Sequence, residues 1–352
     1  MHTMKDNDAF DRSKIYEKLD YVPEPSGYKA GLPWVVQQQI AATNGIQYVD
    51  RIGKLNEYPE FELPVSMVEE GLMLDIGTGW GRWLIAGQKK GYTPIGADIR
   101  LEFCKTALNT MRAKGINGYT VVADLQELPF QDKVFDLVWS FSVIQHTHKD
   151  RMLGCLNHIH RILKAGAYTK LEFPNAYGFH NYFGPYPRSL QTADDFQSWE
   201  VRYYSIGEYR KIFMSIFHNF KYQVHSMLGI GVLKEDLKYV SLKNKLLCSL
   251  SLTGSLAAKI ITPLKTLCDS VYVQAVKEGF GINQQAIMKF RAAHNSNPAD
   301  NLNIIHLLRC PISGEALHLS DAKDRIINTS HNISYPLIDS IPIVIKSEAT
   351  VS

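Results

Sequence analysis

The sequence has few of the features that mark secreted, disulfide-rich or membrane-spanning chains. Its 352 residues include five cysteines, an odd number without a C-x-x-C pair, so we expect no disulfide framework. The longest weakly charged stretch, 246–258, is shorter than the roughly 18 apolar residues of a spanning helix. Residues 1–20 are polar and lack the apolar core of a signal peptide. These absences favour a globular protein of the cytoplasm.

The chain also lacks a strong charge of either sign, and it has no internal repeat. Its formal net charge is +3, which is too small to indicate a nucleic-acid partner. A hydrophobic content of 45% and a charged content of 21% are ordinary for a globular protein and supply a sizeable core. The length leaves room for one large domain with additions, or for two domains.

One glycine-rich stretch organises the rest of the chain. Leu72–Arg82 reads Leu-Met-Leu-Asp-Ile-Gly-Thr-Gly-Trp-Gly-Arg, with glycines on alternate positions at Gly77, Gly79 and Gly81. The apolar start predicts a strand, and the following residues, 83–89, predict a helix. A strand, a glycine turn and a helix let backbone N–H groups approach a nucleotide-like ligand closely. We therefore predict a cofactor site at this turn.

The residues of the turn distinguish between two cofactors. The dinucleotide fingerprint G-x-G-x-x-G needs glycine where this chain has Arg82. Asp75, two residues before Gly77, would repel a pyrophosphate, whereas a carboxylate suits the amine and sulfonium of S-adenosylmethionine. The stretch resembles motif I of the class I S-adenosylmethionine-dependent methyltransferases. An NAD-dependent oxidoreductase is disfavoured on the same grounds.

The pattern of apolar runs predicts an α/β fold with a doubly wound sheet. Helical stretches separate the strand-like runs, as in a Rossmann-like domain. The resemblance implies a seven-stranded sheet whose last strand is antiparallel to its neighbours. The expected strands are 72–76, 93–97, 119–123, 134–140, 167–173, 221–227 and 269–277.

Acidic residues follow two of the later strands, where open α/β sheets bind ligands. Asp98 lies about twenty residues beyond Gly77, the spacing at which a carboxylate accepts from ribose hydroxyls; helix capping is the alternative. The resemblance implies that Asp124 and the backbone of Leu125 hold adenine, with a plain turn as the alternative for Asp124. The full set of expected cofactor-binding residues is Asp75, Gly77, Thr78, Gly79, Trp80, Gly81, Asp98, Ile99, Asp124, Leu125 and Ser140.

Residues 135–146 resemble the fourth motif of the same family. Asp136 matches its structural acid, and the resemblance places Ser140 near the methyl group. His146 and His148 are close in sequence, but two histidines without a third ligand make a poor zinc site, so we predict no metal. His146 is a candidate general base, and a pocket or loop residue is the alternative.

A long loop rich in aromatic residues follows the fifth strand, at 174–199. The resemblance implies that this loop contacts the acceptor, and aromatic faces with a few polar groups suit a partly apolar one. Packing of the loop on the sheet edge is the alternative. The expected substrate residues are Tyr177, Tyr182 and Arg188, and His180 is a second candidate base.

Between the sixth and seventh strands lies an insertion, about 229–268, that combines leucine, isoleucine and lysine. A basic amphipathic helix of this kind can lie on an anionic membrane surface, which predicts peripheral membrane contact. A helical cap over the substrate site, or a packing face, is the alternative.

A second resemblance concerns the C-terminal end. After a polar stretch, 279–303, that we expect to be a linker, the chain resembles the small zinc-ribbon-like domain of the tRNA-methyltransferase activator family. Cys310-Pro311 and the closing run 335–345 match it. Where zinc-binding members have a second cysteine, this chain has Ser313, and one cysteine cannot hold zinc. We expect a metal-free α+β domain.

The expected organisation is an N-terminal arm or lid at 1–70, a methyltransferase domain at 71–278, the linker, and the activator-type domain at 304–352. The central region is also similar to ubiquinone and menaquinone biosynthesis methyltransferases. We predict methyl transfer from S-adenosylmethionine to a small-molecule or lipid-linked acceptor, with nucleic acid not favoured. Methylation of tRNA or protein and a non-catalytic cofactor-binding scaffold are the alternatives. The oligomeric state is left open.

Overall fold

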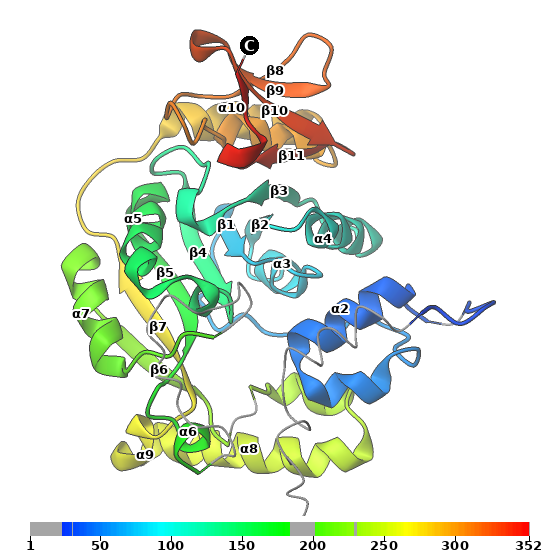
Figure 1. Cartoon of the computed structure of the whole chain (residues 1–352), viewed down its shortest axis with the longest axis vertical. Helices are drawn as coiled ribbons and strands as arrows, with labels where there is room; N and C mark the ends of the chain where they lie inside the picture. The colour runs from blue at the N-terminus through cyan, green and yellow to red at the C-terminus, as the bar shows by residue number, and fades with distance from the viewer. Residues whose placement is uncertain (1–22, 30, 184–200, 229–230, 352) are drawn as a thin grey trace, which may run out of the picture. The chain divides into compact units, whose positions relative to one another are not determined.

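A computed structural model gives the fold and describes residues 23–29, 31–183, 201–228 and 231–351. The chain forms two compact units, each assembled from separate segments (Figure 1). The first, called here the helical unit, contains the described parts of Met1–Glu60, Pro174–Ile206 and Gln223–Val271. The second, called the sheet unit, contains Phe61–Phe173, Gly207–Tyr222 and Tyr272–Ser352.

The central sheet confirms the predicted α/β class. Its strands follow the order β6-β7-β5-β4-β1-β2-β3 and then β11-β10-β9-β8, with β12 paired to β10. The pairs that β1, β2, β3, β4 and β5 form with one another are parallel. The first seven strands are β1 (Gly71–Ile76), β2 (Tyr92–Asp98), β3 (Tyr119–Ala123), β4 (Phe135–Phe141), β5 (Leu163–Pro174), β6 (Lys221–Ser226) and β7 (Ser270–Val276).

The direction of β7 follows from its bonds to β5. The Gly166 N–H donates to the Lys277 carbonyl at 2.9 Å, and the Lys277 N–H donates to the Ala167 carbonyl at 2.8 Å. Gly166 has φ +77°, so the three residues form a glycine bulge of the kind found in antiparallel pairs. The end of β7 therefore runs against β5.

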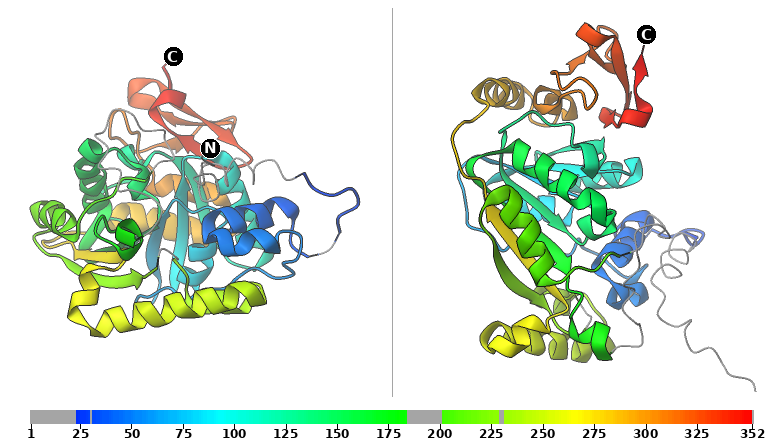
Figure 2. Two further views of the ribbon diagram at one scale, coloured as in Figure 1. Left: turned by 60° about the horizontal axis from the view of Figure 1, so that its bottom comes forward. Right: turned by 60° about the vertical axis from the view of Figure 1, so that its left-hand side comes forward.

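Helices cover both faces of the sheet, and Figures 1 and 2 show α3 and α4 on one side and α5 and α7 on the other. All residues of β1 and β3 are buried, as expected for central parallel strands that read as continuous apolar runs. The tryptophan of α3, Trp83, packs against Trp139 of β4 with ring centroids 4.9 Å apart. These helices are α3 (Arg82–Gln88), α4 (Leu101–Ala113), α5 (Met152–Ile162) and α7 (Ile206–Phe217).

The C-terminal segment continues this sheet. Strand β11 pairs in parallel with β3, with Ile343 opposite Val122 and Val344 opposite Ala123. The remaining strands of the segment extend the sheet away from β3. The C-terminal strands are β8 (His318–Leu319), β9 (Arg325–Asn328), β10 (Ile333–Ile338), β11 (Ile341–Val344) and β12 (Thr350–Val351).

The stretch 279–303 is not a plain connector as the sequence suggested. It contains helix α10 (Gln284–Ser296), which Asn283 caps by accepting from the Ala286 N–H at 3.1 Å. The buried ring of Phe290 on α10 stacks edge-on against Tyr119 of β3, with centroids 5.2 Å apart. Most residues on the exposed face of this helix are polar. The helix packs on the sheet through its buried residues, Ala286 and Phe290.

Asn301 ties the C-terminal segment to β3. Its side chain is 1% exposed. It makes the two backbone bonds that a neighbouring strand would make: its oxygen accepts from the Thr120 N–H at 2.8 Å, and its amide donates to the Thr120 carbonyl at 3.0 Å. The same amide donates to the Ser340 carbonyl, between β10 and β11, at 2.8 Å. One side chain thus satisfies backbone groups of two segments.

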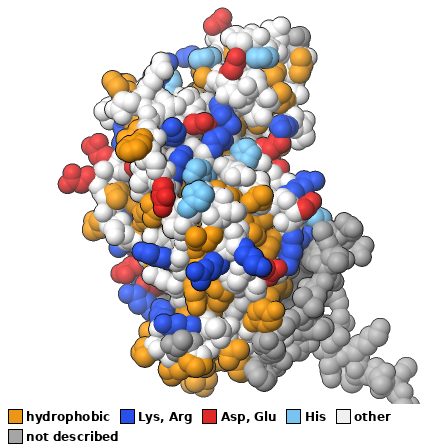
Figure 3. Space-filling model, turned by 90° about the vertical axis from the view of Figure 1, so that its left-hand side faces the viewer, with side chains coloured by type: hydrophobic (Ala, Val, Ile, Leu, Met, Phe, Trp, Pro, Cys, Tyr) orange, Lys and Arg blue, Asp and Glu red, His pale blue; other side chains and the backbone are white. Residues whose placement is uncertain are grey.

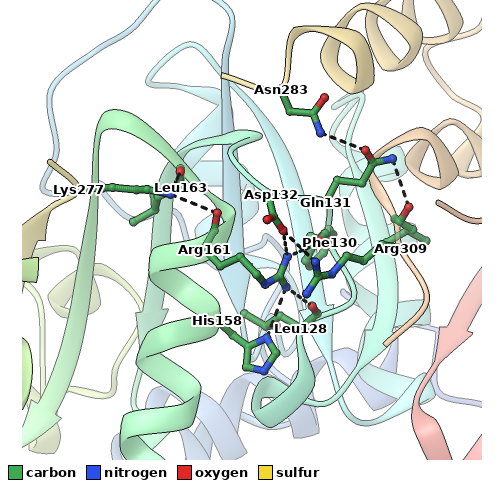
Figure 4. Close-up of polar contacts among 11 residues, drawn as sticks. Leu128, Phe130, Gln131, Asp132, His158, Arg161, Leu163, Lys277, Asn283 and Arg309 are labelled. Atoms are coloured by element: carbon green, nitrogen blue, oxygen red, sulfur yellow. Dashed lines mark hydrogen bonds and ion pairs between the residues drawn. The ribbon is translucent and has the colours of Figure 1, made fainter. Parts of the chain in front are cut away.

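A cluster of charges makes a second tie, shown in Figure 4. Asp132 accepts from Arg161 at 2.7 Å and from Arg309 at 3.0 Å, so it bridges α5 and the C-terminal segment. Arg161 also donates to the Leu128 carbonyl at 2.7 Å. Lys277 donates to the carbonyls of residues 161 and 163, and burial lowers its pKa to about 8.

Cys310 makes hydrogen bonds at the position where the related domains hold zinc. Its sulfur lies 3.2 Å from the Tyr335 hydroxyl and accepts from the Ser313 N–H at 3.4 Å. Burial raises the pKa of the Cys310 thiol, but the bonds from Ser313 and Tyr335 outweigh it, and the net shift is downward. Among the described residues, no group of three His, Cys, Asp or Glu side chains is placed to hold a metal.

The helical unit joins the N-terminal segment to the insertion. The Tyr48 hydroxyl donates to the buried carboxylate of Asp236 at 2.6 Å, and the Glu60 N–H donates to the Tyr239 hydroxyl at 3.2 Å. None of the described helices is long and apolar enough to cross a membrane. The helices of this unit are α2 (Trp34–Asn44), α6 (Phe179–Phe183), α8 (Leu242–Ile260) and α9 (Thr262–Thr266).

We predict that Asn301→Ala destabilises the sheet unit by about 2–4 kcal/mol, because it leaves the buried N–H and C=O of Thr120 without partners. Urea unfolding followed by circular dichroism measures this. Asn295→Ala, which removes an exposed amide from α10, is the matched control and should change stability by less than about 0.5 kcal/mol. Equal unfolding midpoints for the two variants would contradict the role given to Asn301.

Candidate active site

The glycine turn after β1 has a backbone that only glycine adopts readily. Gly77, Gly79 and Gly81 have φ values of +75°, +51° and +94°, in the left-handed region. A Cβ atom on Gly77 would lie 2.1 Å from the side chain of Val143, in the loop after β4. This loop therefore packs directly on the turn, and Gly81 leads into α3.

Asp75 lies beneath the turn as a buried carboxylate. Its side chain is fully buried within β1. Burial raises the pKa of Asp75 well above its usual value, and the nearby charge of Arg82 and a side-chain hydrogen bond with Thr78 oppose this only in part. A buried carboxylate that its surroundings compensate only in part costs free energy unless a ligand satisfies it, so it marks a site for a donor or cation.

Asp98 ends β2 and connects it to the turn. Its carboxylate accepts from the Gly79 N–H at 3.2 Å and from the Arg100 N–H at 3.1 Å. Burial raises the pKa of Asp98 to about 6, although these backbone bonds favour the charged form. Asp98 does not cap α4, whose N-cap residue is Arg100 without a side-chain cap bond; it accepts from the N–H of that residue instead. Each oxygen keeps a second lone pair for a ligand.

The third acid follows β3. Asp124 caps the short 3-10 turn Leu125–Glu127 by accepting from the Gln126 N–H at 2.8 Å. Asp124 and Leu125 are both half-buried, and Ile99, which follows β2, is 54% exposed. Since β1, β2 and β3 are parallel neighbours, the three acids share one edge of the sheet.

The end of β4 holds the predicted Ser140 and His146. The Ser140 hydroxyl is buried and donates to the Ile76 carbonyl of β1 at 3.0 Å, so it fastens β4 to the strand that carries Asp75. His146 ends the 3-10 turn Ile144–His146, is half-buried, and its backbone N–H donates to the Val143 carbonyl at 3.0 Å. His146 therefore belongs to the loop that packs on Gly77.

The sequence analysis missed Glu172 as a site residue. Glu172 is 3% exposed near the end of β5 and accepts from the Ser142 hydroxyl at 2.8 Å. Ser142 follows β4 with φ +58°, an unusual backbone for a residue other than glycine. The available signal was an acid within the expected strand 167–173, close to its carboxyl end.

Arg82 was used only to exclude a dinucleotide, yet it is part of the site. Its buried guanidinium lies over three rings, 4.5 Å from the centroid of Phe141, 4.9 Å from Trp83 and 5.6 Å from Phe61. Aromatic faces stabilise a buried cation, so Arg82 keeps a positive charge next to Asp75. Its position directly after the third glycine could have indicated this.

The candidate acceptor residues lie in the helical unit or outside the described residues. Tyr177 is 48% exposed, and its N–H donates to the Asn175 side chain at 3.2 Å. His180, on α6, is half-buried and its backbone N–H donates to Asp269 at 2.5 Å. Tyr182 is part of the same helix, and its side chain is outside the described residues. Arg188 also falls outside them.

Comparison with known proteins agrees with this geometry. Residues 73–166, which include the glycine turn and all three acids, match the methyltransferase domain family. The chain is 35% identical over 98 residues to a protein of Encephalitozoon cuniculi named as a candidate methyltransferase, and 33% identical over 93 residues to an uncharacterised protein of Methanocaldococcus jannaschii. These matches cover 28% and 26% of this chain, and the chain spans only 42% and 36% of the two relatives.

The part of the chain that matches the family, residues 73–166, is similar to a methyltransferase domain. Solved structures with a similar fold include the YcgJ protein of Bacillus subtilis, at 18% identity and a TM-score of 0.40 over 60% of this chain and 94% of that one. A SAM-dependent methyltransferase from Archaeoglobus fulgidus is similar at 18% identity and a TM-score of 0.40, over 59% and 86% of the two chains.

A second group of relatives matches a short segment of the chain. The UPF0434 protein of Ectopseudomonas mendocina is 37% identical over 49 residues, which are 14% of this chain and 80% of that protein. The UPF0434 protein of Nitrobacter winogradskyi is 33% identical over 58 residues, which are 16% of this chain and 88% of that protein. The chain therefore belongs to the UPF0434 family through this segment, in keeping with the resemblance of its C-terminal part to the activator domain.

We predict that affinity for S-adenosylmethionine falls as the pH is lowered from about 7 to about 5. The pKa of Asp98 is about 6 in the folded protein, so acidification protonates its carboxylate and weakens its capacity to accept from hydroxyl donors. Calorimetric titrations across this range measure the dissociation constant.

Asp98→Asn is the companion variant for this pH series. It should bind more weakly at about pH 7 and lose the part of the pH dependence that centres on pH 6. An unchanged pH profile in Asp98→Asn would assign the titration to another group and remove the ligand role of Asp98.

Proposed function

We propose that this protein transfers a methyl group from S-adenosylmethionine to a small-molecule or lipid-linked acceptor. The observation that carries the proposal is the buried carboxylate of Asp75 beneath the glycine turn, which Arg82 and Thr78 compensate only in part. A cationic amine satisfies such a group, and a pyrophosphate is repelled by it. The match of residues 73–166 to the methyltransferase domain family supports the same assignment.

In this proposal each part of the cofactor has its own group of residues. Asp75 and the glycine turn hold the methionine portion, Asp98 accepts from the ribose hydroxyls, and Asp124 with the Leu125 backbone holds the adenine. Asp98 is suited to this role because its other contacts already fix its orientation through Gly79 and Arg100. The residues assigned to the cofactor remain Asp75, Gly77, Thr78, Gly79, Trp80, Gly81, Asp98, Ile99, Asp124, Leu125 and Ser140.

The bound cofactor supplies a methyl group on a cationic sulfur. The protein's contribution is to hold the acceptor in line and to exclude water, since correct alignment alone contributes several kcal/mol in comparable reactions. The buried rings of Trp83 and Trp139 beside the turn make its surroundings apolar. A base is needed only for an acceptor that must lose a proton, and His146 and His180 are the candidates.

We infer the class of acceptor from the residues of the helical unit. This unit combines the segment after β5, the N-terminal segment and the insertion. The family resemblance connects the first with acceptor contacts and the second with a lid. Tyr177 offers an exposed aromatic face there. We assign Tyr177, Tyr182 and Arg188 to the acceptor, and no stripe of lysine and arginine favours nucleic acid.

One observation favours a second candidate, methylation of tRNA or protein. The UPF0434-type segment is joined to the methyltransferase sheet through β11 and β3, and Asp124 directly follows β3. A fused activator-type segment at this edge is suited to support the adenine end of the site. A cofactor-binding scaffold without turnover would have the same structure, and only an assay separates it from an enzyme.

We predict that Asp75→Asn weakens binding of S-adenosylmethionine at least about tenfold, because it removes the charge opposite the amine. The ligand-free variant should be at least as stable as the wild type, since the amide no longer carries a buried charge. Calorimetry and thermal unfolding measure the two effects. Asp150→Asn, an exposed acid of the same unit, is the control and should change neither.

Two outcomes would overturn the cofactor assignment. Binding of NAD in preference to S-adenosylmethionine would restore the oxidoreductase reading. Unchanged affinity in Asp75→Asn would show that this carboxylate does not face the cofactor.

The acceptor is tested with methyl-labelled S-adenosylmethionine. We expect label in small-molecule or lipid fractions of a cell extract, quinone-containing fractions included, with loss of transfer in Asp75→Asn. Label in tRNA or protein would favour the second candidate instead. Cofactor binding without label in any fraction would identify a scaffold.

A further inference from the structure

Helix α8 exposes its apolar face. Leu242, Leu246, Leu250, Leu256 and Ile260 are between 54 and 84% exposed, although leucine and isoleucine are usually buried. At about 100° per residue these five side chains fall on one side of the helix. Figure 3 shows apolar side chains gathered over α8 and α9, with lysine and arginine side chains beside them.

The opposite face of α8 is the buried one, and it is built from small side chains. Cys248, Ser251, Ser255 and Ala258 are at most 5% exposed. The Ser251 hydroxyl donates to the Met227 carbonyl at 2.7 Å, so the helix is fixed to its own unit by small and polar groups. The helix is therefore oriented opposite to an ordinary amphipathic surface helix, whose large apolar residues face the protein core.

The charged residues of α8 and α9 themselves have a single sign. The helix carries Lys243, Lys245 and Lys259, and Lys265 follows in α9, while no Asp or Glu occurs between positions 242 and 268. By helical spacing Lys243 falls on one flank of the leucine face, and Lys245 and Lys259 fall on the other. Long lysine side chains on both flanks can extend to a charged surface while the leucines are buried between them.

We propose that α8 is an interfacial helix that binds the surface of an anionic lipid bilayer. The leucine face would enter the boundary between headgroups and acyl chains, and the flanking lysines would contact anionic headgroups. A second copy of the chain fits the charges less well, because two α8 helices packed face to face would bring lysines against lysines. Binding by α8 does not depend on the proposed activity, since it needs neither cofactor nor turnover.

The test is flotation of the full chain with two kinds of vesicle, one of phosphatidylcholine alone and one containing phosphatidylglycerol. We expect binding to the anionic vesicles that weakens with added salt. Leu246→Glu combined with Leu250→Glu should abolish it, because both leucines would otherwise be buried in the interface. Lys243→Glu and Lys259→Glu should each lower the partition coefficient at least about fivefold.

Matched controls come from the exposed face of α10. Met288 is 62% exposed and Lys289 is also exposed, so Met288→Glu and Lys289→Glu repeat the same chemical changes away from α8. Both controls should float like the wild type. Retained thermal unfolding midpoints in all variants exclude loss of fold as the cause.

Three results would overturn the proposal. The first is absence of binding to anionic vesicles, and the second is binding that the α8 variants do not change. The third is a dimer in sedimentation velocity that becomes a monomer in the Leu246→Glu and Leu250→Glu variant, which would show that a second copy covers the face. A protein that binds vesicles but transfers no methyl group would contradict the proposed function and leave this inference intact.

Discussion

The burial of one carboxylate is the constraint on which the site depends. Asp75 lies on a central strand of a sheet that helices cover on both faces, so water does not reach its carboxylate and its pKa rises. A buried charge of this kind costs several kcal/mol unless it is compensated. Arg82, held on aromatic rings, supplies part of the compensation. The glycines let neighbouring segments pack closely on the turn, because a Cβ atom on Gly77 would lie 2.1 Å from the side chain of Val143.

A small number of contacts also attaches the C-terminal segment to the sheet. A short segment buries a limited apolar surface by itself. Cys310 bonds to Ser313 and Tyr335. Attachment to the sheet adds to the buried contacts of this segment: β11 joins β3, and Asn301 pairs with the backbone of Thr120. A strand edge that would otherwise be exposed is covered by the same contact.

Local sequence was sufficient to predict the glycine turn, the strand segments 72–76, 93–97 and 119–123, and the three acids near the strand ends, but not that the C-terminal strands extend the expected seven-stranded sheet. Each depends on residues close together in the chain, such as Asp75 and Gly77. The stacking of Arg82 on Phe61 and Phe141, and the bond between Ser142 and Glu172, join segments far apart in sequence. A single sequence contains no signal for such pairings. Helix α10 was missed because its polar exposed face outweighs the few residues that dock it.

The sequence pattern of helix α8 does not predict which of its faces is buried. The spacing of its leucines predicts an amphipathic helix, but the same spacing describes a face turned to the core or to the outside. In the structure the side with small residues faces the rest of the helical unit. Ser251, Ser255 and Ala258 let the helix approach its unit closely, where leucines would not fit. Once the small residues occupy the inside, geometry forces the large ones outward. A folded protein that keeps leucines exposed in a row needs a partner for them, because apolar surface in water has a free-energy cost that burial removes.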